Sequence, residues 1–300
     1  MPAVLTQPAP APSLTLPRDS PLYWWHLLSL DAPTVAVAWG WLFARAFFVQ
    51  LPKFSLLTLA LGTWCVYVAD RLLDGWLLRP DATLRERHHF YARHRRVFLF
   101  ALLAAWLPLA YCLGERVAAR VRWDDLLLTA IGLLYFALVH GGAFLRFGNR
   151  RALLPKELAV GILFAVAVAV PAWAHLHGRH FALLLAVASF AMLCCWNCIA
   201  IQTWEDADAG ISTQRECVHR ATAWLGRHLL SSSLALAVLL AIASVAMPVT
   251  STRWIFFCCL LSALLFSLLQ RIHTSLHPRT LRVAVDLALL TPLLAMVLAR

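Results

Sequence analysis

The chain has 300 residues, of which 61% are hydrophobic and 14% are charged, and its mean hydropathy is +0.72. Soluble domains carry about 25% charged residues, so this composition excludes an ordinary soluble protein. The net charge of +11 is spread over several short segments. This distribution indicates contact with anionic membrane lipids or a phosphate-bearing substrate, and no nucleic-acid partner.

Apolar runs separated by polar breaks predict nine membrane-spanning helices, because a helix needs about 20 apolar residues to cross a bilayer. In chain order the predicted spans are 33–51, 54–70, 97–114, 124–145, 153–174, 180–203, 222–247, 253–271 and 281–299. Residues 1–20 are rich in Pro and Ala and are predicted to be a disordered tail. Residues 21–300 then form a single membrane domain, and the expected fold is an all-α bundle of nine transmembrane helices.

The distribution of Lys and Arg predicts the orientation of this bundle. Segments on the side of the N-terminus carry 18 of these residues, and segments on the opposite side carry 7. Positive residues are enriched on the cytoplasmic side of a membrane. We therefore expect the N-terminus and the segments after the even-numbered spans to be cytoplasmic, with a bacterial inner membrane as the expected location.

Two carboxylates lie where the second predicted span ends, in the sequence YVADRLLDG. Asp70 and Asp74 are four residues apart, so on a helix they share one face. Adjacent carboxylates repel each other unless a cation lies between them, and Mg²⁺ is commonly held by one or two carboxylates and substrate phosphates. Arg71 offers a further phosphate contact. Two solvated acids at a helix end remain the alternative interpretation.

A second acidic group follows the sixth predicted span, in the sequence NCIAIQTWEDADAGIST. Its members Glu205, Asp206 and Asp208 lie on the same predicted side of the membrane as Asp70 and Asp74. Acids at matching ends of two spans can face each other across a bundle, and acids at a membrane edge are functional-site candidates by default. Together the two groups favour a site that holds Mg²⁺ ions against a diphosphate.

These two motifs resemble those of the UbiA superfamily of integral-membrane prenyltransferases. That family has nine transmembrane helices, an N-x-x-x-D-x-x-x-D motif after the second helix and a D-x-x-x-D motif after the sixth. The sequence ADRLLDG matches the end of the first motif at Asp70 and Asp74. The sequence EDADAGIST resembles the end of the second motif, with Asp206 at its second Asp. The resemblance implies the nine-helix fold of this family over residues 21–300.

The resemblance also implies roles for individual residues. The expected catalytic residues are Asp70, Asp74 and Asp206. The expected metal ligands are Asp70, Asp74, Gln202, Glu205, Asp206 and Asp208. The stretch NRRALLPKELAVGILF is similar to the basic entry to the family's fifth helix. The expected contacts to the substrate diphosphate are therefore Arg71, Arg150, Arg151 and Lys156.

The chain departs from the family pattern at two positions. Val66 stands where the family has the Asn of the first motif, and Gln202 stands where it has the first Asp of the second. The carbonyl oxygen of Gln202 can still coordinate a cation, although it carries no charge. Glu205 and Asp208 supply further carboxylates near that position.

The function implied by the resemblance is Mg²⁺-dependent transfer of a prenyl group from a prenyl diphosphate to a lipophilic, often aromatic acceptor within the membrane. Three alternatives remain. The first is an inactive family member that binds isoprenoid or lipid without turnover, motivated by Val66 and Gln202. The second is a transporter, whose sites usually lie near the bilayer midplane. The third is a CDP-alcohol phosphotransferase, whose D-G-x-x-A-R motif is not matched by DGWLLRPDA.

Overall fold

The computed structural model describes residues 14–77, 86–116, 123, 155–178, 180–208 and 220–298. In these ranges all regular structure is helical, apart from an isolated bridge between Leu14 and Leu276. The elements, in chain order, are α1 (Pro21–Leu27), α2 (Asp31–Ala46), α3 (Ser55–Leu77), α4 (Glu86–Arg93), α5 (Arg95–Tyr111), η1 (Cys112–Arg116), α7 (Lys156–Ala174), α8 (His180–Asp208), α9 (Arg220–Arg227), α10 (Leu229–Ala246), α11 (Thr250–Ile272), η2 (His273–Ser275), α12 (Pro278–Leu287) and α13 (Pro292–Leu298).

Within the described ranges, six helices are long and apolar enough to cross a membrane, and the number rises to eight if each of two bent helix pairs is one span. The six lie in α3, α5, α7, α8, α10 and α11, and the bent pairs are α1 with α2 and α12 with α13. The chain is therefore a multi-pass helical membrane protein, as its composition predicts. The fourth predicted span, 124–145, lies outside the described residues.

Bends interrupt both ends of the bundle. α1 meets α2 at 90°, and α12 meets α13 at 44°. Ser29 lies in the first bend with a φ of 55°, a left-handed conformation that a right-handed helix cannot contain. Pro292 begins α13 and has no backbone N–H to continue the hydrogen bonding of α12. The last predicted span, 281–299, is therefore interrupted by a bend, whereas the α1–α2 bend lies before the first predicted span, 33–51, most of which corresponds to α2.

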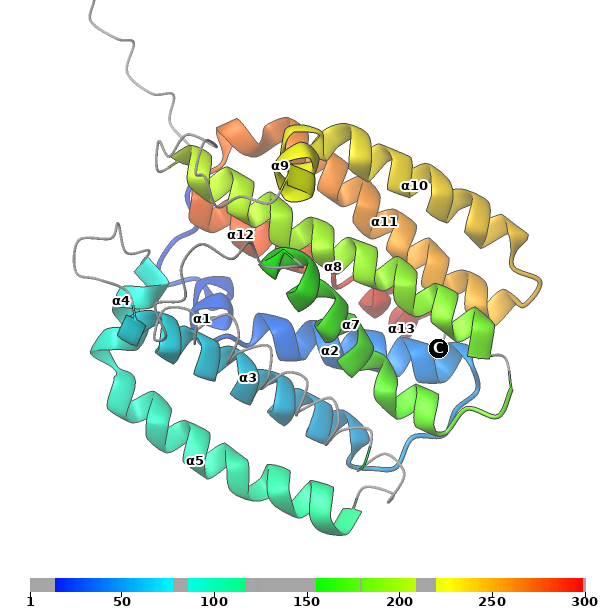
Figure 1. The fold of residues 1–300 in the computed structure, drawn as a ribbon, viewed down its shortest axis with the longest axis horizontal. Helices are drawn as coiled ribbons and strands as arrows, with labels where there is room; N and C mark the ends of the chain where they lie inside the picture. Colours follow the sequence, from blue (N-terminus) through cyan, green and yellow to red (C-terminus); the bar gives the residue numbers. More distant parts are fainter. Residues whose placement is uncertain are drawn as a thin grey trace, which may run out of the picture.

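α2 lies at the centre of the bundle and contacts α3, α7 and α11, while α7 packs on α8 and α10 packs on α11 (Figure 1). Trp39 and Phe43 of α2 are fully buried. The indole of Trp39 stacks on the ring of Phe190 from α8, with 4.3 Å between ring centroids. Its Nε1–H donates to the carbonyl of Leu289 at 2.7 Å, which attaches the C-terminal bend to the same core.

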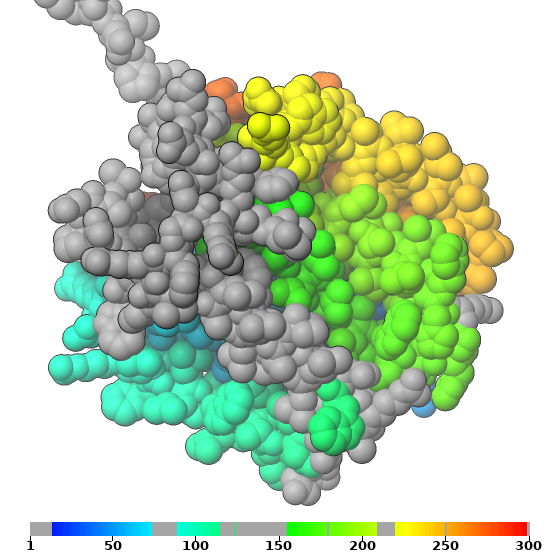
Figure 2. Space-filling view, in the orientation of Figure 1, coloured from blue at the N-terminus to red at the C-terminus, as the bar shows by residue number. Residues whose placement is uncertain are grey.

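α5 forms one flank of the bundle, and α10 lies on the opposite flank (Figure 2). Large apolar side chains of α5 are exposed, among them Phe100, Leu103, Trp106 and Leu107. Contiguous apolar surface of this kind is rare on soluble monomers. It suits contact with lipid, in agreement with the assignment of α5 as a candidate membrane span.

The described part of the N-terminal tail is hydrogen-bonded, which corrects the prediction of disorder up to residue 20. The backbone N–H of Leu14 donates to the carbonyl of Ser275 at 3.1 Å, and the N–H of His277 donates to the carbonyl of Leu14 at 3.1 Å. The N–H of Leu16 donates to Thr280 Oγ1 at 2.8 Å. The turn before α12 leaves backbone groups that need partners, and the tail supplies them.

Gly161 permits close contact between α7 and α8. A Cβ at this position would lie 2.6 Å from the backbone N and 2.7 Å from the Sγ of Cys195. We expect Gly161→Ala to lower the free energy of unfolding by about 1–3 kcal/mol, because the helices must separate to admit the methyl group. The measurement is the thermal unfolding midpoint of the purified protein in detergent.

Gly62→Ala is the matched control for this prediction. A Cβ on Gly62, in the middle of α3, would meet no other atom within 4 Å. In a helix, replacing Gly with Ala is then expected to stabilise by about 0.5–1 kcal/mol. Equal effects of the two substitutions would contradict a tight α7–α8 contact at Gly161.

Candidate functional site

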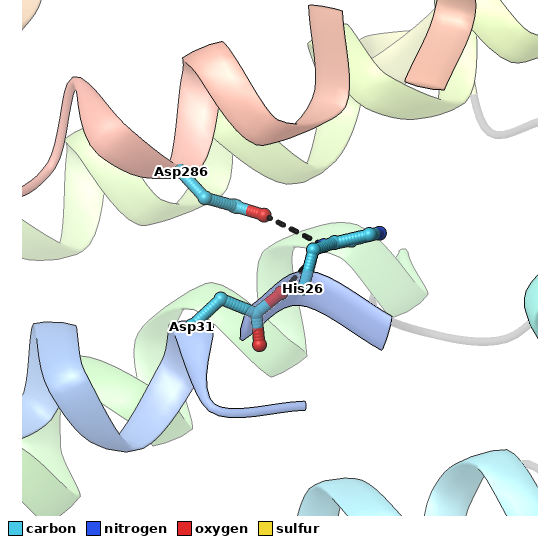
Figure 3. A group of neighbouring side chains, drawn as sticks. All are labelled: His26, Asp31 and Asp286. Carbon is cyan, nitrogen blue, oxygen red and sulfur yellow. Dashed lines mark hydrogen bonds and ion pairs between the residues drawn. The ribbon is translucent and has the colours of Figure 1, made fainter. Parts of the chain in front are cut away.

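A buried polar cluster lies where the α1–α2 bend meets α12 (Figure 3). His26 Nδ1 lies 2.8 Å from Asp31 Oδ2 and 3.6 Å from Asp286 Oδ2. The other carboxylate oxygen of Asp31 accepts the backbone N–H of Ala32 at 2.9 Å. His26 and Asp31 are 8% and 4% exposed. The imidazole thus connects two carboxylates from opposite ends of the sequence inside an apolar bundle.

Asn197 brings α8 into this cluster. Its Nδ2 donates to Asp286 Oδ1 at 3.3 Å, and its Oδ1 is buried without a hydrogen-bond partner. An unsatisfied buried acceptor costs about 1–3 kcal/mol. This cost indicates that the amide oxygen is positioned for a partner other than the described side chains.

A hydrogen bond from α4 stabilises the bend that positions His26 and Asp31. The hydroxyls of Ser29 and Tyr91 lie 2.9 Å apart. Tyr91 is fully buried, and its ring stacks on Phe98 with 4.1 Å between centroids. Burial raises the pKa of Tyr91, so the phenol stays neutral and can share its proton with Ser29.

The first acidic motif is helical throughout, because α3 continues beyond the predicted span to Leu77. Asp70 is partly buried, whereas the side chain of Asp74 lies outside the described part of the structure. Arg71 is 7% exposed, and its Nε has no hydrogen-bond partner among the described residues. The guanidinium interacts electrostatically with Asp31 and Tyr91. Arg71 therefore points inward, toward the cluster around His26.

The second acidic motif is also helical, because α8 continues to Asp208. Gln202 Nε2 donates to Asp206 Oδ1 at 2.7 Å, so these two side chains share a face as their spacing predicts. Glu205 faces α12, where it forms an ion pair with Arg282. Asp208 is exposed. The structure thus directs the acids of this motif to different surroundings.

The two acidic motifs end on the same side of the bundle, with α7 packed against both α3 and α8 (Figure 1). Among the described side chains, no three of Asp70, Glu205, Asp206 and Asp208 lie close enough together to hold one metal ion. The side chains of His26, Asp31 and Asp286 do lie close enough together to hold one. Lys156 is exposed at the start of α7. Arg150 and Arg151 lie outside the described residues. The metal and diphosphate roles expected for these residues stay predictions.

The cluster around His26 was not predicted from the sequence. Asp31 and Asp286 both lie in apolar runs, and such acids are a signal of function by themselves. Their partner was not evident, because His26 belongs to a separate short helix. The structure places Asp286 beside His26 and Asn197.

Comparison with known proteins adds no assignment: no protein-family model, no curated protein and no solved structure matches this chain. The class of protein defined by the fold and the polar residues is therefore a multi-pass helical membrane protein with buried ionisable groups at one end of its bundle.

Proposed function

We propose that this protein is a membrane prenyltransferase of the UbiA type, which transfers a prenyl group from a prenyl diphosphate to a lipophilic acceptor. The observation that supports this function best is the environment of Arg71. A guanidinium is a planar donor suited to phosphate oxygens. Arg71 is buried beside Asp70 at the end of an apolar helix, and its Nε has no hydrogen-bond partner. An anionic substrate group would satisfy that donor.

The described side chains of the two acidic motifs offer the kind of ligand atom that Mg²⁺ binds. Asp70, Gln202 and Asp206 offer oxygen atoms, which Mg²⁺ prefers, and Mg²⁺ needs only one or two carboxylates when substrate phosphates complete its coordination. Glu205 is paired with Arg282, so it fits this role less well. Mg²⁺ would neutralise the charge that develops on the leaving diphosphate.

The residues of the chain have two tasks in this function. Arg71 binds the diphosphate and orients it at the end of α3. The neighbouring apolar interior, where the rings of Tyr67 and Phe164 lie 6.3 Å apart, excludes water from the prenyl group. The acceptor is expected to enter from the membrane, and the bond to the diphosphate breaks as the bond to the acceptor forms.

The proposed topology follows from the same family. It comprises nine transmembrane helices with the N-terminus in the cytoplasm of a bacterium and both acidic motifs on that side of the inner membrane. The basic segments near the ends of α3 and α8 support this orientation, since positive residues are enriched on the cytoplasmic side.

A second candidate function is binding of an isoprenoid or lipid without turnover. Three observations favour it. The side-chain amide of Gln202 donates a hydrogen bond to Asp206, and Glu205 is paired with Arg282. Val66, at the position of the family's Asn, is 49% exposed. A protein of this kind would bind the prenyl chain but would not release diphosphate.

The test is a binding and turnover assay with farnesyl, geranylgeranyl and longer prenyl diphosphates, with Mg²⁺ and with a chelator. Mg²⁺-dependent binding together with diphosphate release in the presence of an aromatic acceptor supports the transferase. Binding without release supports the second candidate. Absence of Mg²⁺-dependent binding for every donor would rule out the transferase.

Gln202→Asp is expected to tighten the binding of Mg²⁺ in the presence of prenyl diphosphate about tenfold, or about 1.4 kcal/mol. In the wild type the amide donates to Asp206. An aspartate would face Asp206 as a second negative charge, and a cation between the two would relieve their repulsion. The measurement is the Mg²⁺ dependence of diphosphate binding.

Ala207→Asp is the matched control, because Ala207 is exposed on the same helix and the substitution adds the same charge. It is expected to leave the Mg²⁺ affinity nearly unchanged. If Gln202→Asp gives no gain over this control, position 202 does not face the metal site.

A further inference from the structure

The proposed prenyl transfer assigns no step to the cluster of His26, Asp31 and Asp286, which lies within electrostatic reach of Arg71. Its three side chains come from α1, α2 and α12, and their potential ligand atoms all lie within 4.8 Å of one another. Asp31 is 4% exposed, and the Asp286 side chain is 15% exposed. Ionisable groups buried inside a membrane protein are rare and generally functional.

We propose that His26, Asp31 and Asp286 bind a transition-metal dication of the zinc class, with Asn197 as the fourth ligand. This site is separate from the acidic motifs at Asp70 and Asp206. Imidazole nitrogen together with carboxylate oxygen is a donor set suited to Zn²⁺, whereas Mg²⁺ selects oxygen donors alone.

The distances fit such an ion. Zn²⁺ binds nitrogen and oxygen at about 2.0–2.2 Å, so its tetrahedral ligands lie roughly 3.4 Å apart. His26 Nδ1 lies 2.8 Å from Asp31 Oδ2 and 3.6 Å from Asp286 Oδ2 (Figure 3). The ligand atoms of all three residues lie within 4.8 Å of one another, so the two carboxylates need to approach each other by at most roughly 1.4 Å to surround one ion.

The charges fit as well. Two carboxylates in a site of low dielectric repel each other strongly unless positive charge lies between them. A dication between Asp31 and Asp286 relieves their repulsion while His26 is neutral, as a metal ligand must be, and Arg71 of α3 adds a further positive charge near Asp31. Binding then displaces the proton from Nδ1, so uptake of the metal weakens as the pH falls.

Asn197 supplies an independent observation. It is 8% exposed, its amide points at Asp286, and its Oδ1 is buried without a partner. Rotation of the amide by half a turn exchanges Nδ2 with Oδ1 and directs the oxygen toward the cluster. In that orientation Oδ1 coordinates the cation as its fourth ligand, and coordination replaces the hydrogen bond that Nδ2 now donates to Asp286.

The experiment uses the full-length protein purified in detergent. The protein is stripped with a chelator, incubated with Zn²⁺ and desalted, and its zinc content is measured by elemental mass spectrometry. The wild type is expected to retain about one zinc ion per chain, consistent with a closed four-ligand site. His26→Gln and Asp286→Asn are expected to retain almost none. The matched controls His175→Gln and Asp19→Asn, which alter residues outside the cluster and outside both acidic motifs, are expected to retain as much as the wild type.

X-ray absorption at the zinc edge of the wild type gives a test that does not depend on the folding of the variants. One imidazole nitrogen with oxygen neighbours, and no sulfur, is the expected result. Sulfur in the spectrum would assign the ion to the cysteines of α8 and overturn the proposal. Failure of the wild type to retain zinc would also overturn it and would leave a proton-bridged ion pair as the role of the cluster.

Discussion

Arg71→Gln is expected to weaken the binding of prenyl diphosphate by about 10- to 100-fold. This decrease in affinity corresponds to the loss of one hydrogen bond to a charged group, which contributes about 1.5–3 kcal/mol. Arg71 is buried in α3, and among the described residues its Nε has no hydrogen-bond partner, so that N–H is available to a bound anion, while the nearby Asp31 carboxylate attracts the same guanidinium. The measurement is equilibrium binding of farnesyl diphosphate in the presence of Mg²⁺.

Arg71→Lys tests whether diphosphate binding depends on the positive charge alone or also on the planar shape of the guanidinium. Lysine keeps the positive charge but lacks the planar fork of the guanidinium, so we expect affinity between those of the wild type and Arg71→Gln. Arg227→Gln is the control, because Arg227 is exposed on α9. The thermal midpoint of each variant shows whether the protein stays folded. Wild-type affinity in a folded Arg71→Gln variant would contradict a role of Arg71 in binding the diphosphate.

Arg282→Met is expected to lower the free energy of unfolding by about 3–5 kcal/mol, the range found when one partner of a buried ion pair is removed. The side chains of Arg282 and Glu205 are 17% and 14% exposed. Without Arg282, the carboxylate of Glu205 would lose the ion pair that joins α8 to α12. The measurement is unfolding of the purified protein in detergent, followed by temperature or denaturant.

A double variant distinguishes the ion pair from simple packing. Replacing both Glu205 with Leu and Arg282 with Met removes both charges, and we expect most of the lost stability to return. Arg227→Met, at an exposed position, is expected to change stability by less than about 0.5 kcal/mol. A double variant less stable than Arg282→Met would show that the pair itself, rather than the unpaired carboxylate, determines the effect.

Parts of the candidate site could be predicted because they depend on the spacing of neighbouring residues. The prediction that Gln202 and Asp206 share a helix face is confirmed by the hydrogen bond between them. The prediction that Asp70 and Asp74 lie on one helix agrees with the extent of α3. Positions four residues apart meet on any α-helix, so these relations need no tertiary information.

The neighbour toward which each acidic side chain points could not be predicted from residue spacing. Glu205 is next to Asp206 in sequence, but it points to α12 and pairs with Arg282. Adjacent residues on a helix face different neighbours, and the packing of α12 on α8 determines which partner Glu205 meets. The expected role of Glu205 as a metal ligand stays a prediction, with the ion pair as its competing role.

The sequence by itself determined that this is a helical membrane protein, because apolar runs of sufficient length fold as helices wherever lipid surrounds them. It also indicated most helix positions, since α3, α5, α7, α8, α10 and α11 fall within or around predicted spans. Only the tertiary structure decided that His26, Asp31 and Asp286 meet. Their contact depends on the left-handed Ser29, on the bond from Tyr91 that stabilises the bend, and on the docking of α12 beside it. The last two are contacts between residues distant in sequence, which no local pattern of residues encodes.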